Sequence, residues 1–95
     1  MTTEAKLYSA LKYRVEVLRS GIRVHYNAQG YLHCEAGPAI EYSTGGRVWY
    51  QNGLLHRADG PAIEWPDGIK KWYLNGKKYT EQVYYAQLKA LEQTP

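Results

Sequence analysis

The strongest constraint on the fold of this chain is a repeat with a period of 23 residues. The pentapeptide Gly-Pro-Ala-Ile-Glu at 37–41 returns at 60–64, and the Trp-Tyr-x-Asn-Gly segment at 49–53 returns at 72–76. Without gaps, residues 37–59 and 60–82 are identical at ten of 23 positions. Such a period indicates one small structural unit that is duplicated and packs on its neighbour.

An earlier and weaker copy fits the same frame at 14–36. Aligned without gaps, the three copies place these residues in columns: Val17, Ile40 and Ile63; Arg19, Tyr42 and Trp65; Tyr26, Trp49 and Trp72; His33, His56 and Tyr79. We therefore expect three copies, of which the first has diverged furthest.

Each copy has the sequence pattern of a β-hairpin unit. Asn-Gly at 52–53 and at 75–76 is the strongest short hairpin signal, because a type I′ turn needs positive φ at both central residues. Glycine-containing turns are also predicted at 19–21, 44–46 and 66–68. The β-rich runs between the turns are 22–26, 39–42, 47–51, 62–65 and 69–74.

Two-residue turns fix the pairing of the strands that they join. Across 52–53, Gln51 should oppose Leu54, and Trp49 should oppose His56. Across 75–76, the same rule places Tyr73 opposite Lys78 and Trp72 opposite Tyr79. If the first copy turns on Gln29-Gly30, Tyr26 opposes His33.

Both ends of the chain depart from the repeat and read as short helices. Thr2 or Thr3 can cap a helix within 1–13, and Thr80 can cap one within 80–93, where Tyr84 and Leu88 recur at helical spacing. We predict a single domain over 1–95 that is mainly β (α+β). Its antiparallel sheet of tandem 23-residue hairpin repeats spans 14–79, with a short helix at each end to cover the strand edges.

Composition excludes several classes of protein. Twelve Lys and Arg against nine Asp and Glu give a net charge of +3, which makes nucleic-acid binding unlikely on charge alone. A single cysteine excludes a disulfide framework and a multi-cysteine zinc site. No apolar run is long enough to span a membrane, and no signal-peptide pattern is visible at the start. We expect a cytoplasmic protein.

The repeat unit resembles a known pattern. Residues 49–68 read W-Y-x-N-G-x-x-H-R-x-D-G-P-A-x-E-x-x-D-G, and this is similar to the tandem repeats of small phage and bacterial proteins and to MORN-like repeats, including those of antitoxins. The resemblance covers about 20–79. It implies a scaffold or binding surface rather than a catalyst, and the phage association implies host interaction or anti-defence, with the host cytoplasm as the location.

No residue set in the sequence predicts catalysis, a cofactor or a metal. His33 and His56, with Glu41 and Glu64, recur once per copy, which a structural column produces, whereas catalysis needs different groups at one place. We expect Asp59 to form an Asx turn before Gly60-Pro61. Cys34 is interpreted as an unreactive filler, because neighbours along a strand point to opposite faces.

Aromatic and basic side chains are the candidate binding residues. Tyr and Trp are suited to partly solvated surfaces and are common at interface hot spots. This chain has ten Tyr, three Trp and no Phe. A lysine cluster surrounds the last hairpin, where Lys71, Tyr73 and Lys78 share a face. The full set of candidates is Tyr26, Tyr42, Trp49, Trp65, Trp72, Arg47, Arg57, Lys71, Tyr73 and Lys78.

Four hypotheses of function remain open, one of which is nucleic-acid binding through the lysine cluster within 70–78. The leading one is a non-catalytic inhibitor or adaptor that binds a bacterial protein through the aromatic columns. The alternatives are a sponge for a small (cyclic) nucleotide, in which the aromatic rings stack on the base and cations hold the phosphate, and a MORN-like antitoxin. A half-covered sheet also makes a homodimer possible, by pairing of two faces or two edges.

Overall fold

The computed structural model describes residues 13–92, which are mainly β. The elements are β1 (Tyr13–Val17), β2 (Arg23–Asn27), β3 (Ile40–Glu41), β4 (Arg47–Val48), β5 (Tyr50–Gln51), β6 (Leu54–Leu55), β7 (Ile63–Glu64), β8 (Lys70–Leu74), β9 (Lys77–Tyr79) and α2 (Glu81–Glu92). The predicted N-terminal helix over 1–13 lies outside the described residues except for Tyr13, which begins β1.

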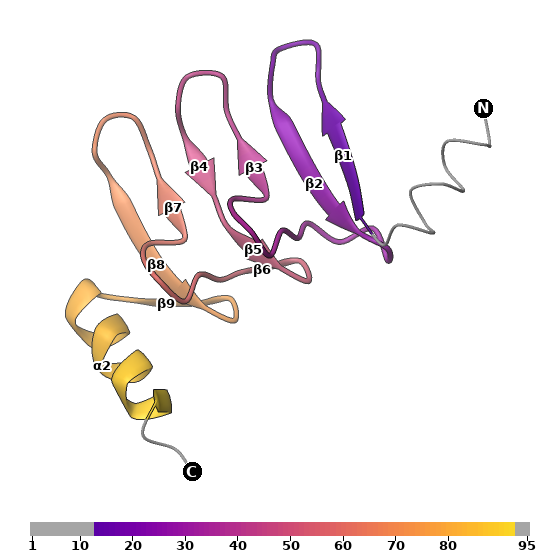
Figure 1. Ribbon diagram of the computed structural model, residues 1–95. Coiled ribbons are helices and arrows are strands. Elements are labelled where there is room, and N and C mark those ends of the chain that lie inside the picture. Colours follow the sequence, from indigo (N-terminus) through magenta and orange to yellow (C-terminus); the bar gives the residue numbers. More distant parts are fainter. Residues whose placement is uncertain (1–12, 93–95) are drawn as a thin grey trace.

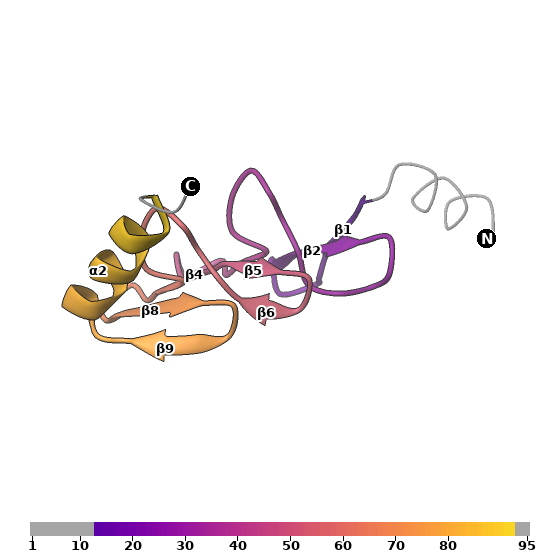
Figure 2. The ribbon, with the colours of Figure 1, turned by 90° about the horizontal axis from the view of Figure 1, so that it is seen from below.

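All strand pairs are antiparallel (Figure 1). Seven strands form one sheet in the order β1-β2-β3-β4-β7-β8-β9, and β5 and β6 form a separate small hairpin. The described chain measures 47 × 37 × 17 Å, with a radius of gyration of 15.1 Å. A compact domain of this length has a radius of gyration of about 12 Å. The sheet is therefore an extended, thin layer, as Figure 2 also shows.

Both Asn-Gly turns have the predicted backbone conformation. The φ angles are 51° at Asn52 and 84° at Gly53, and Asn75 and Gly76 repeat them at 50° and 82°. The predicted pairing across these turns is confirmed. The pairs are Gln51 with Leu54, Tyr50 with Leu55, Trp72 with Tyr79 and Tyr73 with Lys78, and the His56 N–H donates to the Trp49 carbonyl.

The predicted register of the first hairpin is wrong by one residue. Tyr26 pairs with Leu32 rather than with His33, and the Asn27 N–H donates to the Tyr31 carbonyl. The loop therefore contains three residues, 28–30, instead of the two residues of a type I′ turn. The Asn27 side-chain carbonyl accepts from the N–H groups of Gln29 and Tyr31, both at 3.0 Å, and this stabilises the wider loop.

The extra loop residue also corrects the predicted columns. Tyr26 pairs with Leu32 as Tyr50 pairs with Leu55, so Tyr26 corresponds to Tyr50 and not to Trp49. The columns that began with Val17 and Arg19 are shifted in the same way. Leu18 closes the loop 19–21 through the Ile22 carbonyl, as Tyr42 and Trp65 close the two later loops.

Two adjacent rows of side chains cross the seven-stranded sheet. One row alternates in charge: Arg23, Glu41, Arg47, Glu64 and Lys70 oppose one another in turn. The next row, on the other face, is apolar: Val24, Ile40, Val48 and Ile63, flanked by Glu16 and Lys71. Opposite charges and β-branched pairs both stabilise neighbouring strands, by about 0.2–1 kcal/mol for each pair.

The predicted C-terminal helix is confirmed as α2. The Thr80 hydroxyl caps it by accepting from the Val83 N–H at 3.2 Å, and Glu81 lies in its first turn. Tyr84 is fully buried and anchors α2 beside β8 and β9 at one end of the sheet (Figure 1). In the range 13–92, no helix is long and apolar enough to cross a membrane.

Removal of the Tyr84 hydroxyl should destabilise the protein. The hydroxyl donates to the Arg57 carbonyl and accepts from the Gly60 N–H, so Tyr84→Phe leaves both backbone groups unpaired in a buried place. We expect a loss of about 1–3 kcal/mol in the free energy of unfolding, measured by urea titration. Tyr85→Phe is the control, because that ring is 45% exposed. Equal stability of Tyr84→Phe and the wild type would contradict the assigned role.

Candidate binding surface

The two recurrent histidines hold the Asn-Gly turns in place. The Nδ1 atom of His33 accepts from the Asn52 N–H at 3.0 Å, and Nδ1 of His56 accepts from the Asn75 N–H at the same distance. An accepting Nδ1 requires the neutral tautomer with its proton on Nε2. Each imidazole therefore positions a turn that lies 19 residues further along the chain.

Arg57 is the centre of a second set of contacts, which we call the arginine cluster: Trp49, Arg57, Asp59, Pro61 and Glu64. The guanidinium lies 3.7 Å from the centre of the Trp49 ring. Its Nε donates to Asp59 at 2.9 Å, and its Nη1 donates to the Pro61 carbonyl and to Glu64, both at 3.0 Å. These partners hold the Arg57 side chain against the sheet, and only 19% of it is exposed.

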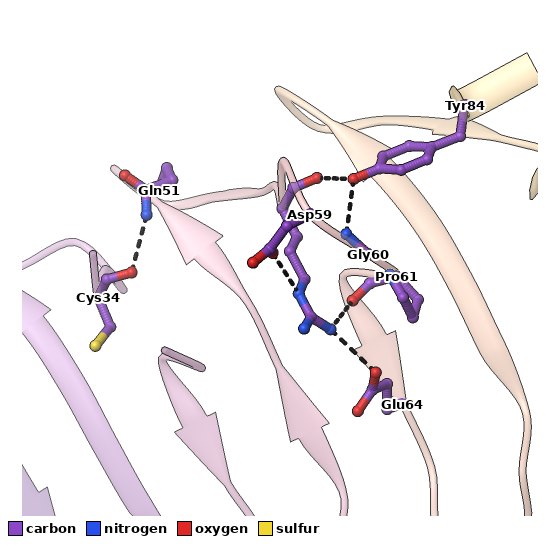
Figure 3. Close-up of polar contacts among 8 residues, drawn as sticks. Cys34, Gln51, Asp59, Gly60, Pro61, Glu64 and Tyr84 are labelled. Carbon is purple, nitrogen blue, oxygen red and sulfur yellow. Dashed lines mark hydrogen bonds and ion pairs between the residues drawn. The ribbon is translucent and has the colours of Figure 1, made fainter. Parts of the chain in front are cut away.

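Tyr84 closes the arginine cluster from the side of α2 (Figure 3). Its hydroxyl bridges the Arg57 carbonyl and the Gly60 N–H. Burial raises the pKa of the Tyr84 phenol, so the hydroxyl remains protonated and able to donate. The helix and the arginine cluster therefore stabilise each other.

Asp59 does not form the expected Asx turn. Such a turn needs the N–H of the residue two positions on, and that residue is Pro61, which has none. The Asp59 carboxylate instead accepts from Arg57 Nε. In the described chain, Asp67 does accept from the Ile69 N–H two positions on, at 3.0 Å.

A hollow of about 360 Å³ adjoins the arginine cluster. Its lining comes from segments 34–37 and 56–59 together with Trp49 and Gln51. Gln51 bridges toward the first segment by donating to the Cys34 carbonyl at 2.9 Å, as Figure 3 shows. The Trp49 ring and the Arg57 side chain that lies over it thus both line the hollow.

The pair of Tyr42 and Trp65 lies at the opposite ends of the hairpins from the Asn-Gly turns. The two rings are 5.6 Å apart and tilted by 50°. Gly46 permits this packing, because a Cβ there would lie 2.9 Å from the Trp65 ring. Arg47, the predicted neighbour of these rings, belongs to the charged row and is exposed.

The predicted lysine cluster lines a groove of about 440 Å³ where β8 and β9 meet the start of α2. We call it the lysine groove, and its lining residues are Lys70, Lys71, Trp72, Lys78, Tyr79, Thr80 and Glu81. Tyr73 does not line it. The indole N–H of Trp72 is buried and donates no hydrogen bond within residues 13–92. Cations and aromatic rings therefore meet in one groove.

The sequence-predicted residues thus fall into separate places rather than one continuous patch. Trp49 and Arg57 lie together, as do Tyr42 and Trp65, and Trp72 lies with Lys71 and Lys78. Tyr26 stands apart, beneath the Arg14 guanidinium at 4.4 Å. The predicted column of Tyr26, Trp49 and Trp72 does not form, because Tyr26 is equivalent to Tyr50 and Tyr73 instead.

Sequence reasoning missed two exposed apolar residues beside the Asn-Gly turns. Tyr31 is 55% exposed and packs on Gly53, and Leu54 is 49% exposed and packs on Gly76. They lie 23 residues apart in equivalent positions, directly after the turn glycines. That recurrence of a large apolar residue at the position after the glycine was the available signal.

Over 13–92, no group of three or more His, Cys, Asp and Glu could hold a metal ion. Cys34 is a free cysteine and lines a hollow with His33, but no hydrogen bond joins its thiol to an imidazole in this range.

Comparison with known proteins gives no further assignment: no protein-family model, no curated protein and no solved structure matches the chain.

The stability of the protein should fall in mild acid through His56. Burial lowers the pKa of His56 below its ordinary value of 6.5, so the unfolded state binds the proton more readily. The stabilising contribution is complete above the unfolded pKa and is lost as the pH falls through the folded one. Urea titrations between about pH 7 and 5 should show a shallower decline for His56→Gln than for the wild type. Parallel declines would contradict this role.

Proposed function

We propose that the protein is a stack of tandem 23-residue MORN-like hairpin repeats that works as a non-catalytic binding module. Its target is a bacterial protein, and it acts as an inhibitor or adaptor in the manner of phage proteins that counter host systems in the host cytoplasm. The aromatic candidates at Trp49 and Trp72 form the contact surface, with Arg57 and the lysines at its rim.

The observation that carries this proposal is the thin, single-layer sheet. A layer of 17 Å cannot bury both of its faces, and several of its large apolar side chains stay at the surface, among them Tyr31, Leu54 and Ile69 at 49–55% exposure. Surfaces with this much apolar area beside cations are typical of sites for protein partners.

The use of the ionisable side chains supports binding over catalysis. The Nδ1 atoms of His33 and His56 accept hydrogen bonds from turn N–H groups, and the Arg57 guanidinium donates to Asp59, Pro61 and Glu64. Groups held in this way stiffen a surface. A rigid surface loses little entropy on association, and affinity rises accordingly.

Substitution of either tryptophan should abolish partner binding while the fold is kept. The experiment is a tagged pull-down from bacterial lysate that yields a stoichiometric protein, followed by titration of that protein with the purified variants. Trp49→Ala and Trp72→Ala should each raise the dissociation constant by about 30-fold or more, which corresponds to a hot-spot loss of about 2 kcal/mol.

Tyr85→Ala is the matched control for the tryptophan variants. It removes a 45% exposed aromatic ring of α2 that belongs neither to the arginine cluster nor to the lysine groove, and should leave binding unchanged. Circular dichroism establishes that each variant is folded. Full binding by folded tryptophan variants would refute the proposal.

The lysine groove favours a second candidate function, the sequestration of a small nucleotide. Trp72 and Tyr79 could stack on a base, while Lys70, Lys71 and Lys78 bind phosphate in the same groove. This function shares Trp72 with the first proposal but requires no protein partner.

A bound nucleotide should be visible directly in protein purified from bacteria. Denatured and filtered protein would release material with absorbance near 260 nm, and Lys71→Glu with Lys78→Glu should remove it through the loss of both charges. Lys89→Glu, which reverses a single charge at the last turn of α2, is the control for each of the two single reversals. Protein that carries no nucleotide and binds none in titrations with mono-, di- and cyclic nucleotides would exclude this candidate.

A further inference from the structure

The first strand of the sheet leaves one edge open. In the described chain, β1 has β2 on one side and no strand on the other. The other outer strand, β9, has three residues, two of them lysines, and α2 contacts it. Lysines, short length and a covering helix are the usual protections of an edge, and β1 has none of them in the described range.

The hydrogen-bond pattern of β1 identifies which backbone groups point outward. The Leu18 N–H donates to the Ile22 carbonyl. In an antiparallel pair every second residue bonds to the same neighbouring strand, so the backbone groups of Glu16 and Arg14 also bond to β2. The backbone groups of the residues between them point away from β2. Accordingly, the N–H of His25, which opposes Val15, donates to the Ala39 carbonyl on the other side of β2. The N–H and C=O groups of Tyr13, Val15 and Val17 therefore form the free edge.

The side chains of β1 are complementary to a second copy of the same strand. Its sequence is Tyr-Arg-Val-Glu-Val. In an antiparallel pair centred on Val15, Arg14 opposes Glu16 of the other copy, and Tyr13 opposes Val17. Tyr13, Val15 and Val17 are 42%, 39% and 63% exposed. Such a pair would bring two ion pairs and a continuous apolar stripe together.

The register is fixed by charge as well as by the outward groups. A pair centred on Glu16 would place two carboxylates opposite each other, and one centred on Arg14 would place two guanidiniums opposite each other. Like charges directly opposite destabilise strand pairing. A pair centred on Val15 places opposite charges across from each other. It also joins the two strands through the outward N–H and C=O groups of Tyr13, Val15 and Val17.

The Arg14 guanidinium lies over the Tyr26 ring and has no carboxylate at hydrogen-bond distance within the described residues. Its Nε is buried and donates no hydrogen bond within the described residues. The carboxylate of Glu16 on the same strand lies 4.0 Å away, beyond hydrogen-bond distance. A carboxylate from the facing strand would supply an acceptor for the guanidinium.

We propose that β1 is a homodimer interface in which two copies pair antiparallel about Val15 and join their sheets into one. The interface is isologous, because Arg14 of each copy meets Glu16 of the other. This inference stands apart from the binding of a bacterial protein, since it involves neither the tryptophans nor the lysine groove.

Charge exchange tests both the edge and its register. Sedimentation velocity over a concentration series should show dimers of the wild-type full-length chain. Arg14→Glu alone or Glu16→Arg alone should raise the dissociation constant by about tenfold or more, because each places like charges opposite each other. The double variant should dimerise again, and a mixture of the two single variants should form a heterodimer.

Two further variants separate loss of pairing from loss of folding. Val15→Pro removes an outward N–H while sparing the ladder to β2, so it should give a folded monomer by circular dichroism. Lys89→Glu reverses a distant charge and should leave the dimer unchanged. A monomeric wild type, a dimer that persists in both single reversals, or a mixture of the two that fails to associate would each overturn the proposal.

Discussion

The layer depends on hydrogen bonds that tie each Asn-Gly turn to the segment before it. The Asn52 N–H bonds to His33 and the Gly53 N–H bonds to the Leu32 carbonyl, and 23 residues later Asn75 and Gly76 repeat both bonds with His56 and Leu55. A single-layer sheet has no second layer to align its hairpins. Polar contacts between successive turns supply that alignment where apolar burial alone cannot.

A small core also explains why charges recur across the sheet. The buried apolar residues are few and mostly small: Val24, Ala39, Val48, Ala62, Leu74 and Tyr84. Ala39 and Ala62 have no exposed surface. With so little apolar area to gain, cross-strand pairs such as Arg47 with Glu64 add stability on the other face. The arginine cluster belongs to this same system, since Glu64 also accepts from Arg57.

The sequence predicted the two Asn-Gly turns, which local chemistry specifies. It did not predict the register of the first hairpin, which depends on one inserted residue. Asn52-Gly53 and Asn75-Gly76 specify their turns and hence their pairing. In the first copy, Gly30 was read as the same turn, but Asn27 bonds to Gln29 and Tyr31 and stabilises a longer loop. The alternation of a strand converts that single residue into a change of face, so Tyr26 left the predicted column. Residues 14–17 of β1 lay inside the sheet predicted over 14–79, although no separate strand was named there, and Tyr13 had been assigned to the N-terminal helix.

The candidate site shows the same division between local and tertiary information. The aromatic and basic residue types were evident from composition, but their grouping was not, because Arg57 reaches both Trp49 and Glu64 through a fold that joins separate copies. These contacts fix the conformation of the Arg57 side chain and leave it less free to adjust to a partner. A partner at this surface would meet a guanidinium already neutralised by Asp59 and Glu64, so recognition there would depend on the shape of the Trp49 hollow. Net positive charge is concentrated instead around Lys71 and Lys78, and electrostatic attraction of an acidic partner would act at that end of the sheet.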